Sequence, residues 1–213
     1  MIEHLLKSSA VSVIKRPIRN LIWGVRGWRI VNPVLPRHVR SIVFVCLGNI
    51  CRSPFAAAVC VRRLHGARAE FFCSSAGISV KQGNQPPDEA RTAASAYGVS
   101  LDQHRPLLLT RQLVVDHDLV VVMDAAQLKT LRARHPDLSD RIVLLSLFDE
   151  RASNALERFN IVDPFSRPLG EFVTCYERID RAVEHLMHDL GIAVRPPRPS
   201  APDTREPVPA RTK

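Results

Sequence analysis

Segments that would place this chain in a membrane or direct it to secretion are missing from its sequence. No uninterrupted apolar run reaches the roughly 18 residues that a transmembrane helix needs, although 46% of the 213 residues are hydrophobic. No apolar core is followed by a small-residue cleavage site, as a signal peptide would require. We therefore expect a cytoplasmic protein.

Cysteine pairs with a recognisable spacing are also missing. The five cysteines are an odd number and include no Cys-x-x-Cys pair, which argues against a disulfide framework and a zinc site. We expect Cys60, Cys73 and Cys175 to serve ordinary packing. Six of the eight histidines were considered as ligands and have no metal-binding spacing, so we expect solvated or capping roles for them and no cofactor: His65, His104, His117, His135, His185 and His188.

Acidic residues are scarce at the two ends of the chain. Residues 1–40 hold eight Lys and Arg against Glu3 alone, a net charge of +7, and residues 191–213 carry a net +3. Because the whole chain carries +9, the middle is close to neutral at −1. The distribution predicts a basic extension over 1–40, one domain over 41–190 and a disordered Pro- and Arg-rich tail over 191–213.

The basic extension contains one helical pattern. After Pro17, apolar residues recur at helical spacing, with Arg16 and Arg19 on the other side: Ile18, Leu21, Ile22 and Val25. This predicts a basic amphipathic helix, which could lie on an anionic surface at the inner face of a membrane, dock on a partner protein or pack on its own domain. Nucleic acid binding is not expected, because no motif interleaves stacking aromatics with the basic residues.

The middle of the chain alternates apolar strands with helices. Strands are predicted at 42–45, 70–73, 119–123 and 142–145, and helices at 54–65, 88–97, 110–115, 125–134 and 169–190. This order predicts a doubly wound α/β fold with a parallel four-stranded sheet and helices on both faces, with the ligand at the carboxyl ends of the strands.

The loop after the first strand contains the chemistry. Residues 45–54 read V-C-L-G-N-I-C-R-S-P and set Cys46 and Arg52 at the two ends of a short turn. In such a turn the backbone N–H groups and the helix N-terminus form an anion cradle, Gly48 lets the backbone approach closely, and Arg52 can bind two phosphate oxygens. The same groups favour a thiolate at Cys46. The residues expected to form this phosphate-binding loop are Leu47, Gly48, Asn49, Ile50, Cys51 and Ser53.

The loop matches every fixed position of V-C-x-G-N-x-C-R-S-P, and on it the chain resembles the low-molecular-weight protein tyrosine phosphatase family. The resemblance covers about residues 41–190 and includes 74–77, 86–88, His104, 120–124 and 163–165. It implies that Asp163 donates a proton to the departing phenol. It also favours Asp163 over the other candidate acids, which are Asp116, Asp118, Asp124 and Asp149.

The resemblance implies roles for the loop residues. Cys46 attacks phosphorus, a phosphocysteine forms, and Asp163 then activates the water that releases phosphate. Ser53 is expected to donate a hydrogen bond to the Cys46 sulfur, and Asn49 to hold the loop through side-chain to backbone bonds. Cys51 is expected to close a reversible disulfide with Cys46, which would protect the nucleophile from irreversible oxidation.

Three alternatives stay open. Arsenate reductases of this fold use downstream cysteines that residues 116–126 lack, and arginine phosphatases have threonine where this chain has Ile50. A phosphotyrosine-binding module without turnover is the third. The cleft also departs from the family, because 78–81 contains no aromatic residue and Ser166 follows Phe165. Bacterial relatives with this poorer cleft act on tyrosine kinases of exopolysaccharide export, so we expect a phosphotyrosine protein, such as a membrane tyrosine kinase, as the partner.

Overall fold

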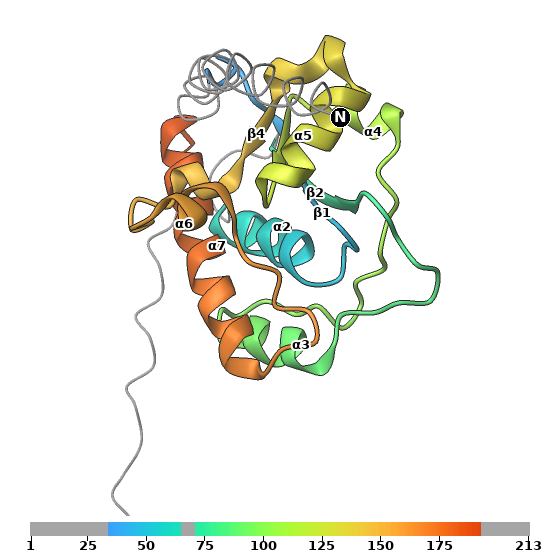
Figure 1. Cartoon of the computed structure of the whole chain (residues 1–213), viewed down its shortest axis with the longest axis vertical. Coiled ribbons are helices and arrows are strands. Elements are labelled where there is room, and N and C mark those ends of the chain that lie inside the picture. Colours follow the sequence, from blue (N-terminus) through green and yellow to red (C-terminus); the bar gives the residue numbers. More distant parts are fainter. Residues whose placement is uncertain (1–33, 65–70, 193–213) are drawn as a thin grey trace, which may run out of the picture.

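Four parallel strands form the central layer of the protein, seen in a computed structural model that describes residues 34–64 and 71–192 (Figure 1). They are β1 (Ser41–Cys46), β2 (Phe72–Gly77), β3 (Leu119–Val122) and β4 (Ile142–Leu144), in the spatial order β2-β1-β3-β4. All three pairings are parallel. The predicted doubly wound sheet, with the phosphate-binding loop after its first strand, is confirmed. The predicted helix within 1–33 and the tail beyond 192 lie outside the described residues.

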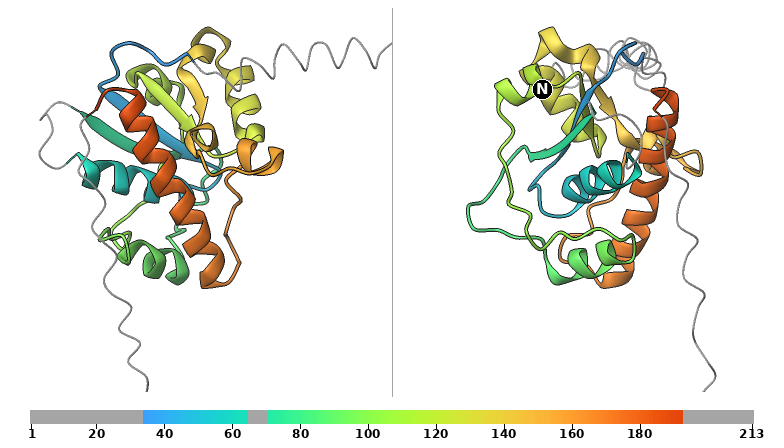
Figure 2. Two further views of the ribbon diagram at one scale, coloured as in Figure 1. Left: turned by 90° about the vertical axis from the view of Figure 1, so that its left-hand side faces the viewer. Right: turned by 180° about the vertical axis from the view of Figure 1, so that it is seen from behind.

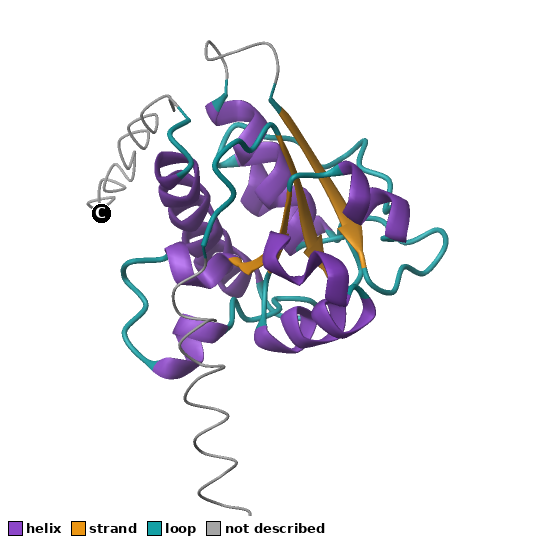
Figure 3. Ribbon diagram, turned by 90° about the horizontal axis from the view of Figure 1, so that it is seen from above, coloured by secondary structure: helices purple, strands orange, loops and turns teal. Residues whose placement is uncertain are grey.

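Helices cover both faces of the sheet (Figure 3). On one face lie α2 (Arg52–Arg63), α3 (Asp88–Ser95) and α7 (Leu169–Asp189), and on the other α4 (Arg111–Asp116) and α5 (Ala125–Arg134). The connections add η1 (Pro136–Arg141), η2 (Leu145–Phe148) and α6 (Ala155–Phe159). Within the described residues, no helix is long and apolar enough to cross a membrane.

Two apolar cores follow from the alternation of side chains along the strands. In β1, Ile42 and Phe44 face the core beneath α2 and α7, whereas Val43 and Val45 face the core beneath α4 and α5. A strand buried on both faces must be apolar throughout, which explains the β-branched run that predicted it. Leu35 and Val39 also pack against the first core, so contact with the core begins before residue 41.

Helix α7 crosses α2 and reaches the phosphate-binding loop (Figure 2). The Tyr176 ring stacks on Phe55 of α2, with centroids 3.8 Å apart and planes inclined by 3°. The buried Tyr176 hydroxyl donates a hydrogen bond to the carbonyl of Cys51 at 3.1 Å. One aromatic residue of α7 therefore fixes both the first turn of α2 and the loop before it.

The position of the second strand was predicted wrongly. It was expected over 70–73, of which residue 70 lies outside the described residues, but β2 begins at Phe72 and continues to Gly77. Its pairing with β1 runs from Ser41 opposite Phe72 to Cys46 opposite Gly77. Small residues have low strand propensity, and here the ladder with β1 outweighs it.

Helix α6 was not predicted because it is only five residues long. Asn154 caps it by accepting a hydrogen bond from the Glu157 amide at 3.0 Å, and the Glu157 carboxylate accepts one from the Ser153 amide at 2.8 Å. This reciprocal arrangement is a capping box. The spacing of Asn154 and Glu157 was the signal in the sequence that could have located the helix.

The prediction that Cys60 and Cys73 serve packing alone is wrong. The two residues form a disulfide between α2 and β2, with Cα atoms 6.7 Å apart, within the range that a disulfide spans. They are separated by 13 residues, a spacing that matches no disulfide signature. Only the packing of α2 against β2 brings them together. Cys46, Cys51 and Cys175 are free.

We expect three titratable thiols in the unreduced, denatured protein and five after reduction. The Cys60–Cys73 bond withholds two of the five cysteines. Thiol titration in guanidinium measures this, and Cys60→Ser should raise the unreduced count to four by freeing Cys73. Five thiols in the unreduced wild-type protein would show that the bond does not form.

Candidate active site

The phosphate-binding loop joins the carboxyl end of β1 to the first turn of α2. Asn49 has φ 55°, the left-handed region that asparagine tolerates better than most residues. Helix α2 begins at Arg52, two residues before the predicted start, and Cys51 occupies its N-cap without a side-chain capping bond. No side chain at the N-cap therefore takes up the first N–H groups of α2, which makes this helix end a ready anion site.

Hydrogen-bonding groups surround the sulfur of Cys46, which is 3% exposed. The Asn49 amide donates to Sγ at 3.2 Å, and the Ser53 hydroxyl lies 3.0 Å from Sγ. Ser53 Oγ also accepts a hydrogen bond from Asn49 Nδ2 at 2.9 Å. A hydroxyl has one proton to give, and a sulfur that ionises can only accept, so Ser53 would direct that proton to Cys46.

Asn49 holds the loop with its whole side chain. Nδ2 donates to Ser53 and to Ser75, each at 2.9 Å, while Oδ1 accepts from the Leu107 amide at 2.8 Å. The Asn49 carbonyl accepts from His104 Nε2 at 2.7 Å. The loop is thus tied to β2 and to the segment after α3. Sequence reasoning missed Ser75, whose neighbours along the chain gave no sign of the contact.

Two histidines are not solvated, contrary to expectation. Burial lowers the pKa of His104, although its hydrogen bond to the Asn49 carbonyl acts the other way. His117 is 4% exposed and bonds Ser74 Oγ and the Leu113 carbonyl, both at 2.8 Å. Among the described residues, no group of three or more His, Cys, Asp or Glu could hold a metal.

Arg52 connects the loop to two other segments. Nη1 donates to Asp124 at 3.2 Å and to the Ile161 carbonyl at 3.1 Å, and Nη2 contacts Asp163 at 2.5 Å. Burial disfavours the charged guanidinium, but Asp163, Cys46 and Asp124 outweigh it and raise the pKa of Arg52. The buried Nε has no hydrogen-bond partner among the described residues.

The five candidate aspartates differ in their surroundings. Asp124 holds Arg52 and caps α5 by accepting from the Gln127 amide, and Asp163 contacts Arg52 with its side chain 40% exposed. The remaining three are bound away from Arg52: Asp116 by Gln112, Asp118 by Ser41 and Asp149 by Arg178. Only Asp163 combines contact with Arg52 and access to solvent at this level.

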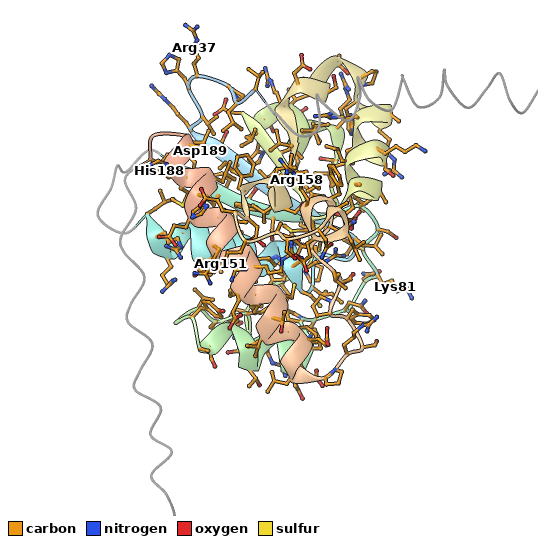
Figure 4. All side chains as sticks on the ribbon, turned by 60° about the vertical axis from the view of Figure 1, so that its left-hand side comes forward. Arg37, Lys81, Arg151, Arg158, His188 and Asp189 are labelled. Atoms are coloured by element: carbon orange, nitrogen blue, oxygen red, sulfur yellow. A yellow bond between two sulfur atoms is a disulfide. The ribbon has the colours of Figure 1, made fainter. Side chains whose placement is uncertain are left out.

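The rim of the site is mainly apolar. Leu47 and Phe165 are about half exposed, at 53% and 52%. Ile50 is 8% exposed and belongs to the core beneath α2, so little of it is open to a substrate. Lys81, in the segment after β2, projects away from the surface (Figure 4). Burial raises the pKa of the Cys51 thiol, which is free, as is Cys46.

Gly77→Ala tests the fit between β2 and the loop. A Cβ at this position would lie 2.9 Å from the Leu47 carbonyl, 3.0 Å from Asn49 Cβ and 2.7 Å from Val80 Cγ2. We expect a loss of about 1 to 3 kcal/mol in the free energy of unfolding and at least a tenfold loss in kcat/KM on an aryl phosphate. Gly170→Ala in α7, where a Cβ meets nothing within 4 Å, is the control. Equal, small effects of the two variants would contradict the close fit.

Comparisons with known proteins agree with this geometry. The sequence profile of the family described as "Low molecular weight phosphotyrosine protein phosphatase" matches residues 41–195. The chain is 34% identical over 146 residues to the probable low molecular weight protein-tyrosine-phosphatase EpsP of Ralstonia nicotianae, covering 68% of this chain and 92% of that protein.

Solved structures give the same result. The crystal structure of the Erwinia amylovora tyrosine phosphatase AmsI matches with a TM-score of 0.63 and 27% identity, covering 72% of this chain and 94% of that one. The arginine phosphatase YwlE of Geobacillus stearothermophilus shares the fold, with a TM-score of 0.62 and 24% identity over 71% of this chain and 93% of that one. The chain belongs to the low molecular weight protein-tyrosine-phosphatase family, an enzyme family of phosphoric monoester hydrolases.

Proposed function

We propose that this protein hydrolyses phosphotyrosine in proteins through a phosphocysteine at Cys46. The observation that carries the proposal is Arg52, a buried cation beside Cys46 whose Nε has no hydrogen-bond partner among the described residues. A buried donor without a partner costs free energy, and a phosphate oxygen would satisfy it. The N-terminus of α2, without a side-chain cap, adds donors aimed at the same anion.

Substrate binding would exchange the partners of Arg52. The phosphate dianion is held by amides of residues 47–52 and by Nε and Nη2 of Arg52, in the paired geometry that arginine offers to oxyanions. It displaces the Asp163 carboxylate from Nη2, while Asp124 and the Ile161 carbonyl keep Nη1 in place. Asp163 is then free to meet the leaving group.

The reaction follows in two transfers. The Cys46 thiolate forms a bond to phosphorus as the bond from phosphorus to the tyrosine oxygen breaks, and Asp163 gives that oxygen a proton. The loop amides and Arg52 stabilise the charge on the equatorial oxygens. Water then attacks phosphorus and gives a proton to Asp163, the bond between sulfur and phosphorus breaks, and phosphate leaves. Ser53 stabilises the Cys46 sulfur as a leaving group.

The rim favours an aryl substrate over the alternatives. Leu47 and Phe165 offer exposed apolar surface to an aromatic ring. For the thiol relay of an arsenate reductase, residues 116–126 offer no cysteine, and Cys175 is buried with a pKa raised by burial to about 12. A phosphoarginine substrate and a binding module without turnover remain as outcomes of the first test.

We propose a cytoplasmic setting in which the partner is a tyrosine kinase of polysaccharide export. The support is the resemblance to bacterial relatives, together with the net charge of +7 over residues 1–40, which would hold the enzyme on an anionic membrane near such a kinase. Oxidation would join Cys46 and Cys51 in a reversible disulfide that guards the nucleophile. Peptide mapping after mild peroxide treatment tests that bond, and sulfinic acid on Cys46 without the Cys46–Cys51 product would contradict it.

Phosphate release from matched peptides tests the function. Under reducing conditions we expect release from the phosphotyrosine peptide, with no release from the phosphoserine or phosphoarginine peptide. Cys46→Ser should abolish it, because the substituted oxygen is a far weaker nucleophile than a thiolate. Preference for phosphoarginine would replace the proposed substrate, and binding without release would favour the non-catalytic module.

Vesicle sedimentation tests the role of the basic extension. We expect the whole chain to sediment with vesicles that contain anionic lipid, and less so as salt rises, because each basic side chain near the surface contributes about 1 kcal/mol. Deletion of residues 1–33 should remove this binding and leave hydrolysis of a small aryl phosphate unchanged. A whole chain that stays in the supernatant at low salt would contradict the membrane proposal.

A further inference from the structure

We propose that Arg178 of α7 is the positioning residue for the acid loop, defined here as residues 161–168. The proposal rests on the proposed function, because it assigns Arg178 to the placement of Asp163 as the acid. Arg178 does not touch the loop 47–51 or the sulfur in the hydrogen bonds seen among the described residues. Its effect on catalysis would pass through the backbone that leads to Asp163.

The Arg178 guanidinium binds three acceptors at once. Nε donates to Asp149 Oδ2 at 2.9 Å, Nη2 to the Glu157 carbonyl at 2.8 Å and Nη1 to the Asn160 carbonyl at 3.0 Å. The side chain is 13% exposed, and that of Asp149 is 1% exposed. The interaction is therefore largely shielded from water, where a charge-assisted hydrogen bond is stronger than at the surface.

The two carbonyls lie where the chain cannot hold itself. Helix α6 has five residues, too few to be stable in isolation, and the last carbonyls of any helix lack partners within it. Arg178 supplies one to Glu157 inside α6 and one to Asn160 just after it. The end of α6 is thereby fastened to α7, a helix of 21 residues packed on the core.

Three residues connect this anchor to the acid. Asn160 pairs with Asp124 in an antiparallel bridge, and the Ile161 amide donates to the Met123 carbonyl at 2.9 Å. The fully buried Ile161 then offers its own carbonyl to Arg52, and Asp163 follows two residues later. A shift at Asn160 would move Asp163 relative to the leaving oxygen, and misplacement by about 1 Å can cost about a hundredfold in rate.

Arg181 provides a matched control on the same helix. Its Nε also contacts Asp149, at 3.3 Å, but within the described part of the chain it makes no hydrogen bond to residues 157–160. Burial disfavours the Asp149 carboxylate, yet Arg178 and Arg181 outweigh it and lower its pKa. Replacing either arginine removes one cation from Asp149, whereas only Arg178 holds the carbonyls of Glu157 and Asn160.

The experiment measures kcat/KM for aryl phosphates of graded leaving ability, from p-nitrophenyl phosphate to phenyl phosphate. For Arg178→Gln we expect a loss of about tenfold or more on phenyl phosphate and less than about threefold on p-nitrophenyl phosphate, because only the poorer leaving group depends strongly on the proton. The dependence on leaving-group pKa should steepen toward that of Asp163→Ala. Arg181→Gln should keep the wild-type slope, and Arg178→Lys should lie between wild type and Arg178→Gln.

Adding Arg178→Gln to Asp163→Ala tests the route of the effect. If Arg178 acts through Asp163, the second substitution should change kcat/KM on phenyl phosphate by less than about twofold. Thermal unfolding is followed for every variant, and if Arg178→Gln does not fold, the slope of Arg178→Lys decides. A loss of folded protein lowers all substrates equally and leaves the slope unchanged.

Two results would overturn the proposal and are distinguishable. Equal losses on both substrates for a folded Arg178 variant, or full additivity with Asp163→Ala, would reduce Arg178 to a structural role while the proposed function stands. A wild-type protein that hydrolyses neither aryl phosphate would overturn the proposed function and the role of Arg178 with it.

Discussion

The buried guanidinium of Arg52 is the interaction on which the other parts of the site depend. It is 3% exposed, and a cation so placed must be paired and hydrogen-bonded to be tolerated. Its partners come from the end of β3, from the Ile161 carbonyl and from Asp163. The end of β3, the acid loop and the start of α2 must therefore meet at one point. The ion pair with Asp163 also keeps acid and cradle together before a substrate arrives.

The fold supports this point from two sides. From β2, Ser75 holds Asn49, and Gly77 lets the Leu47 carbonyl and the Asn49 side chain approach closely. From α7, Tyr176 fixes Cys51, and Arg178 fastens the segment that leads into the acid loop. The edge strand and the last helix thus position a loop that is itself only a few residues long.

The parts that sequence could predict are those with a strong local pattern. The β-branched runs in β1 and β3 and the periodicity of α5 gave elements whose positions agree within a residue, and the loop of ten residues matched a family signature. The parts that it missed depend on contacts far apart in the chain. The small residues of β2 have weak propensity and owe their strand to pairing with β1. Likewise, Ser75, the Cys60–Cys73 bond and Arg178 gain their partners only from packing.

Isolation of the covalent intermediate tests the central claim most directly. The protein would be mixed with a peptide carrying ³²P-labelled phosphotyrosine, quenched within milliseconds and digested, and the labelled fragment identified by mass spectrometry. The account predicts label on Cys46, bound through sulfur, that appears and decays at rates compatible with turnover. Label on another residue, or phosphate release without labelled protein at any time, would contradict nucleophilic catalysis by Cys46.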